Sequence, residues 1–184
     1  MIVDVHGHLV PTDFVAAVRK ERGRFPSLRA IEDGGKLALA FAGGKPSRAI
    51  MPGLSDVAAR LAWMRKQGID RHVVGGWPDW FGYELPAAEA EAWCRMFNDA
   101  QLAAAKAEPR FVPLAMVPLQ DGARAGAVLK AAVAAGFPGA MVSTCRAASA
   151  ACSMPPTLTH FGAQRTRPAR SSTSIRVMIP GTCA

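Results

Sequence analysis

Two histidines near the start of the chain, His6 and His8, are the residues whose type and spacing most directly indicate chemistry. They end the apolar run from Ile2 to Val5, which predicts a buried strand. Because side chains alternate along a strand, residues two apart leave the same face, so both imidazoles can reach one ion. Gly7 between them has no side chain, and we expect it to leave room for an ion or a ligand beside the backbone. The pair is therefore a candidate metal site; the alternative is two ordinary histidines at a strand end.

The elements that must position these histidines alternate along the chain. We predict strands at 2–5, 70–75, 110–117 and 139–143, helices at 12–20, 55–67, 86–107 and 121–135, and a hairpin of strands 36–41 and 47–51. Thr12, Ser55 and Asp121 are the predicted N-caps. Strands followed by crossover helices form parallel sheets, and the hairpin interrupts that rhythm as an insertion. The two histidines then lie at the carboxyl end of the first strand, where α/β barrel enzymes build their sites.

Two further groups of side chains have binding chemistry. Arg48 lies in the predicted hairpin, and a guanidinium can pair with a carboxylate through two parallel hydrogen bonds; the alternative is an exposed hairpin charge. His72, inside strand 70–75, is interpreted as a packed histidine rather than a ligand. An aromatic cluster follows the same strand and is a candidate pocket wall, with packing beneath a loop as the alternative: Trp77, Trp80, Phe81 and Tyr83.

The composition is that of a soluble globular domain: 184 residues, of which 50% are hydrophobic and 20% charged, with a net charge of +8. No apolar run is long enough to cross a membrane and the N-terminus lacks a secretory signal, so we predict a cytoplasmic location and no membrane partner. The basic excess is concentrated in residues 145–184, which contain five arginines and no Asp, Glu or Lys. A basic tail can contact nucleic acid. We do not favour that partner, because the basic residues coincide with a segment whose composition suggests translation in a shifted reading frame.

Four motifs occur in consistent order: I-V-D-V-H-G-H-L-V-P, R-L-A-W-M-R-K-Q-G-I-D, C-R-M-F-N-D and R-F-V-P-L-A-M-V-P-L-Q-D. Together they resemble the amidohydrolase superfamily, in the branch of aminocarboxymuconate-semialdehyde decarboxylase and γ-resorcylate decarboxylase. The resemblance implies an α/β fold, the first half of a (β/α)8 TIM barrel in residues 1–144, with a small β-hairpin insertion and an irregular tail at 145–184. It also implies a divalent metal, zinc above all, on His6 and His8, a small-molecule carboxylate substrate held by Arg48, and homo-oligomers. Asn98 and Asp99 match family positions but are interpreted as structural.

The activity that the resemblance implies is that of a metal-dependent carboxy-lyase acting on a small aromatic or muconate-type carboxylic acid. The family pattern also needs a third His ligand, a later His as general base and an Asp ligand, for which this sequence has no match. We therefore assign no catalytic residue, and we expect weak metal binding and little or no activity from a truncated chain. The alternatives are a metal-dependent hydrolase of the same superfamily and a non-enzymatic binding protein whose basic tail contacts nucleic acid.

The composition of residues 145–184 suggests translation in a shifted reading frame. Back-translation from Pro156, read two bases further on, can yield D-P-F-W and then a strand ending in I-H-P, which are stretches that resemble the family. We therefore predict a frameshift near Cys145; the alternative is a genuine disordered tail. Sequencing the gene across that codon tests this hypothesis, and an intact frame without coding potential in the shifted one would refute it.

Overall fold

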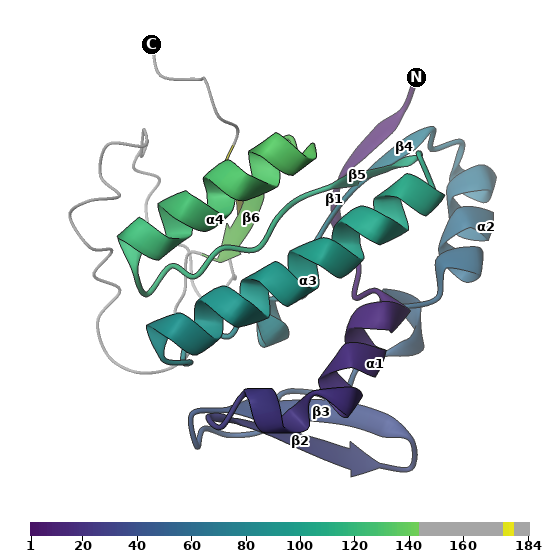
Figure 1. Cartoon of the computed structure of the whole chain (residues 1–184). Coiled ribbons are helices and arrows are strands. Elements are labelled where there is room, and N and C mark those ends of the chain that lie inside the picture. The colour runs from purple at the N-terminus through teal and green to yellow at the C-terminus, as the bar shows by residue number, and fades with distance from the viewer. Residues whose placement is uncertain (144–174, 179–184) are drawn as a thin grey trace, which may run out of the picture.

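A parallel sheet lies at the centre of the chain, which a computed structural model describes over residues 1–143 and 175–178. The order is β1-β4-β5, and a parallel bridge between Ala115 and Ala140 continues it to β6 (Figure 1). The bounds are β1 (Val3–His8), β4 (Arg71–Gly75), β5 (Phe111–Pro113) and β6 (Ala140–Ser143). The predicted parallel α/β architecture is confirmed, with β5 shorter than expected.

Helices connect the successive strands. They are α1 (Thr12–Lys20), α2 (Val57–Gln67), α3 (Ala87–Ala107) and α4 (Gly122–Ala135), with short 3-10 turns η1 (Arg22–Arg24), η2 (Pro52–Leu54) and η3 (Pro78–Trp80). The predicted cap Asp121 accepts the N–H of Arg124 at 3.0 Å. The other two cap predictions are wrong, because Asp56 rather than Ser55 caps α2, and α1 follows Pro11 with no side-chain cap from Thr12.

An antiparallel hairpin interrupts this pattern, but its partner strand is not the predicted one. β3 (Lys36–Phe41) pairs with β2 (Leu28–Asp33), which precedes it, and not with residues 47–51. The turn is formed by Gly34 and Gly35 at φ of 55° and 78°, a left-handed conformation that glycine adopts without steric cost. The Asp-Gly-Gly signal before β3 therefore determines the pairing.

Residues 47–51 lie instead along the other edge of β3. The N–H of Ser47 donates to the carbonyl of Leu39 at 2.7 Å, and the N–H of Ile50 donates to the carbonyl of Leu37 at 2.8 Å. These hydrogen bonds do not form a regular strand ladder, but they hold the segment that carries Arg48 against β3.

The hydrophobic core packs α1 and the hairpin against α3 around Trp93, which is fully buried. Its indole contacts the rings of Phe14, Phe25 and Phe41 edge to face at centroid distances of 4.8, 5.5 and 5.7 Å. The indole Nε1 also donates to the carbonyl of Trp80 at 2.8 Å. Such aromatic pairs contribute more stability than the burial of their surface area alone. Trp93 therefore joins α1 and the hairpin to α3.

β1 is an edge strand among the described strands, pairing with β4 alone. Ile2 is 56% exposed and Val5 66% exposed, so the prediction of a buried first strand is wrong for these side chains. The apolar run predicts a strand correctly, but the described residues leave these side chains uncovered.

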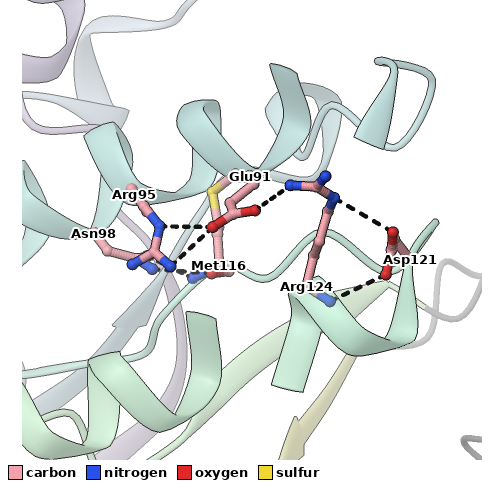
Figure 2. Close-up of polar contacts among 6 residues, drawn as sticks. All are labelled: Glu91, Arg95, Asn98, Met116, Asp121 and Arg124. Carbon is pink, nitrogen blue, oxygen red and sulfur yellow. Dashed lines mark hydrogen bonds and ion pairs between the residues drawn. The ribbon is translucent and has the colours of Figure 1, made fainter. Parts of the chain in front are cut away.

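Ion pairs connect α3 to α4 at the surface (Figure 2). Glu91 accepts from Arg95 at 2.9 Å and from Arg124 at 2.6 Å, and Arg124 Nε lies 3.4 Å from Asp121. The hydrogen bonds from Arg95 and then Arg124 lower the pKa of Glu91. Exposed pairs of this kind contribute little to stability, so the helix packing depends on the core beneath them.

Beyond Ser143 the structure describes one strand, β7 (Ile175–Met178), which pairs antiparallel with β6. It falls within the predicted irregular tail; the rest of that tail lies outside the described residues. Among the residues that the structure describes, no helix combines the length and apolarity needed to span a membrane.

Candidate metal and carboxylate site

The structure places His6 and His8 next to one another at the carboxyl end of β1. Their ring centroids are 5.1 Å apart and the ring planes are nearly perpendicular, at 83°. His6 is exposed and His8 is half-buried. The strand end therefore brings the two imidazoles together, as the spacing predicts.

A backbone contact sets the orientation of the His8 ring. Its Nδ1 lies 2.8 Å from the carbonyl of Gly76, the residue that follows β4. A carbonyl only accepts hydrogen bonds, so Nδ1 is assigned the proton and Nε2 keeps its lone pair. Metal-ligating histidines are usually held in this way. Burial is the main cause that lowers the pKa of His8, favouring the neutral form that binds metals.

The donor chemistry of the pair fits a divalent metal, but the described residues do not complete a site. Two neutral imidazoles suit zinc, whose catalytic sites use three protein ligands. Within residues 1–143, no three His, Cys, Asp or Glu side chains gather closely enough to hold an ion. The described residues therefore offer two candidate ligands, His6 and His8, and no third beside them.

Gly7 is close to a side chain and not to an open space. A Cβ at this position would overlap Nε2 of His72 and lie 2.7 Å from its Cε1. The expectation that Gly7 leaves room for an ion is therefore wrong, because the His72 imidazole fills that room. His72 is buried, as its interpretation as a packed histidine requires.

Arg60 is a positioning residue that the sequence reasoning missed. Its Nη2 donates to the carbonyl of His8 at 2.6 Å and to that of Gly53 at 3.0 Å. Burial lowers the pKa of Arg60, against the opposing effect of Asp4. The sequence does contain a sign of this role: Arg60 lies three residues after Val57 and four before Met64, so it is a charged residue on the apolar face of α2.

Arg48 lies in a second cluster, with Asp79 as its partner. Its Nε and Nη2 both donate to the Asp79 carboxylate at 2.9 Å, and its guanidinium lies 5.4 Å from the Trp77 ring centroid. Arg48 is 70% exposed on its side chain, and the Asp79 hydrogen bond raises its pKa further. Asp79 also raises the pKa of His8, although desolvation prevails there, so the two clusters are electrostatically connected.

The predicted aromatic wall is buried in the same neighbourhood. Trp77, Trp80 and Phe81 are each at most 3% exposed. Trp80 Nε1 donates to the hydroxyl of Ser47 at 3.1 Å, and the Phe81 ring lies 5.4 Å from that of Tyr83. These residues belong to the segment that follows β4, and the ring of Trp77 contacts the Arg48 guanidinium.

Comparison with known proteins gives one curated relative. Over 127 residues the chain is 29% identical to 2-amino-3-carboxymuconate-6-semialdehyde decarboxylase of Caenorhabditis elegans. That stretch covers 67% of this chain but only 31% of the relative, so the chain spans about a third of the relative's length. No family model matches the chain.

Solved structures give the fold. IDCase of Metarhizium anisopliae in its apo form is similar at a TM-score of 0.56 and 17% identity, over 76% of this chain and 41% of that protein. The 5-carboxyvanillate decarboxylase of Sphingomonas paucimobilis is similar at 0.54 and 22% identity, over the same shares. The fold is thus that of part of an amidohydrolase-type α/β barrel. Over about two thirds of its length, this chain is similar in sequence to a decarboxylase.

Proposed function

We propose that this chain is part of a metal-dependent carboxy-lyase that removes CO₂ from a small aromatic or muconate-type carboxylic acid. The observation that carries the proposal is the paired His6 and His8, with His8 held by the Gly76 carbonyl so that the lone pair of Nε2 is free to bind a metal. The similarity to a decarboxylase over 127 residues of the chain supports the reaction class. A hydrolase of the same superfamily would use the same first ligands.

In this proposal His6 and His8 hold a divalent metal, zinc by the preference of imidazole donors. When bound, the metal supplies a Lewis acid that polarises a substrate oxygen or activates a water. Arg48 orients the substrate carboxylate through its guanidinium. A proton would reach the substrate carbon from an acid that the described residues do not supply; the C–C bond then breaks, its electron pair stays on the substrate and CO₂ leaves.

Asp79 changes how Arg48 would bind a carboxylate. Asp79 already occupies two of the five N–H donors of Arg48, so an incoming carboxylate shares the guanidinium or displaces Asp79. The pair is exposed on the arginine side, and exposed ion pairs are worth only about 0–1 kcal/mol. Displacement is therefore inexpensive, and we expect Asp79 to weaken carboxylate binding without preventing it.

Replacing Arg48 should weaken the binding of a carboxylate probe, 2,6-dihydroxybenzoate, by about tenfold for Arg48→Gln, because charged hydrogen bonds are lost. NMR shift titration of the full chain measures the dissociation constant. Arg48→Lys keeps the charge without the fork and should give an intermediate value. Asp79→Asn should strengthen binding by removing the competing carboxylate. Equal binding by all four proteins would remove Arg48 from the proposed site.

A test of the reaction class requires a protein that contains the whole barrel. We propose that residues 1–144 are the N-terminal half of the barrel and that residues 145–184 are read out of frame. A zinc-loaded protein expressed from the restored frame should release CO₂ from an aromatic or muconate-type acid. Hydrolysis of an amide or lactone without CO₂ release would favour the hydrolase instead.

A further inference from the structure

The His72 imidazole is a buried group that the proposed reaction does not use. It is 2% exposed, and its polar contacts, with the carboxylate of Asp4 and the backbone of His6, are weak: they raise its pKa, but burial prevails and lowers it. Its Nε2 lies 3.5 Å from Oδ2 of Asp4, a contact too long for a strong hydrogen bond. A buried polar ring with only weak polar contacts costs stability, so we ask what its position does for the neighbouring strand.

The neighbours of His72 lie on the strand that carries the two candidate ligands. β1 and β4 pair in register at Asp4 and His72, and again at Gly7 and Val74. The register shifts between these two pairs, so β1 contains an extra residue there. Such bulges redirect nearby side chains; here His6 lies within the bulge and His8 follows it.

Two contacts hold that irregular stretch. The Oδ1 of Asp4 accepts the backbone N–H of His6 at 3.0 Å, while its Oδ2 faces His72. The His72 ring occupies the space beside Gly7 that a Cβ would need. From α2, the ring of Trp63 lies 5.7 Å from that of His72, so the imidazole is wedged between this helix and the strand.

We propose that His72 is a positioning residue: packed between α2 and Gly7, and facing Asp4, it fixes the bulge of β1 that presents His6 and His8 side by side. The reason for positioning the two histidines rests on the proposed function, but the packing of His72 against β1 does not depend on a metal. Arg60 supports the same strand end from α2 through the His8 carbonyl. His72 itself binds no substrate in this account.

A double-mutant cycle on the full chain tests the packing part. Gly7→Ala should lower the denaturation midpoint sharply, because its Cβ meets the His72 ring. His72→Ala should relieve that clash, so Gly7→Ala should cost clearly less in the His72→Ala background. Lys66→Ala, at an exposed site of α2, serves as the control. If His72→Ala does not fold, His72→Asn takes its place in the cycle.

Two readouts at the ligands test the positioning part. The ¹⁵N shifts of the His8 ring should report the Nδ1–H tautomer in the native chain and a mixture of tautomers in folded His72→Ala. Zinc affinity should fall about tenfold in that variant, the size of effect seen when outer-shell partners are removed. Neither readout should change in Lys66→Ala.

The outcomes separate this inference from the proposed function. Additive effects of Gly7→Ala and His72→Ala, together with an unchanged His8 tautomer, would overturn the role of His72 even if His6 and His8 bind zinc. If the native chain shows no histidine-dependent zinc binding, the proposed function fails. In that case, a coupled cycle and an altered tautomer would still establish His72 as the residue that positions His8.

Discussion

Replacing Trp93 with alanine should destabilise the chain by about 3–5 kcal/mol, the cost usual for removing a large buried aromatic side chain. Trp93 is fully buried and contacts Phe14, Phe25 and Phe41, which come from α1, the η1–β2 connection and the hairpin. The substitution also leaves the Trp80 carbonyl without its donor. Denaturant unfolding followed by far-UV circular dichroism measures the change in the free energy of unfolding.

The matched control for this substitution is Trp63→Ala. Trp63 is 42% exposed, so the same change of residue should cost only about 1 kcal/mol there. Trp93→Phe should fall between the two, because it keeps an aromatic ring and loses the hydrogen bond. Equal destabilisation by Trp93→Ala and Trp63→Ala would contradict the described core.

Replacing Asn98 with alanine should have the second largest effect, about 2–4 kcal/mol. The buried amide of Asn98 bonds both backbone groups of Met116: its Nδ2 donates to the carbonyl at 3.0 Å, and its Oδ1 accepts the N–H at 2.7 Å (Figure 2). Alanine would leave two buried backbone groups unpaired, each costing about 1–3 kcal/mol. The same unfolding experiment gives the value.

Two variants make the Asn98 experiment specific. Asp99→Ala changes the next, exposed residue of α3 and should leave stability nearly unchanged. Asn98→Asp keeps an acceptor for the Met116 N–H but places a second oxygen against the carbonyl, so it should also destabilise. If Asn98→Ala unfolds at the same denaturant concentration as Asp99→Ala, the two hydrogen bonds between Asn98 and Met116 do not stabilise the fold.

Local sequence signals predict the helices and the parallel strands well because their causes are local. Gly68 and Gly136 end α2 and α4 in left-handed conformations, as their positions predict. The hairpin was less predictable, since two glycine-rich stretches flank β3 and only one of them forms the turn. Beyond β5, the backbone of Leu114 and Ala115 still bonds the neighbouring strand segments, whereas that of Met116 bonds the Asn98 side chain from α3.

The candidate site shows where sequence reasoning stops. The H-x-H spacing is local and predicts that His6 and His8 meet. The contacts of Gly7 with His72, and of Arg48 with Asp79, join residues from separate elements, so only the packing of those elements reveals them. Arg60 combines both kinds of feature. The sequence predicts its place on the apolar face of α2, but not its hydrogen bond to the His8 carbonyl.

Zinc binding by the histidine pair is the measurement that tests the proposed function most directly. The full chain is titrated against a chromophoric zinc chelator, beside His6→Ala, His8→Ala and the matched His160→Ala. We expect weak binding by the native chain, unchanged in His160→Ala and lost in the other two variants, because two imidazoles are an incomplete site. Binding that survives the loss of both His6 and His8 would contradict the account, as would zinc that stays bound stoichiometrically through exhaustive dialysis.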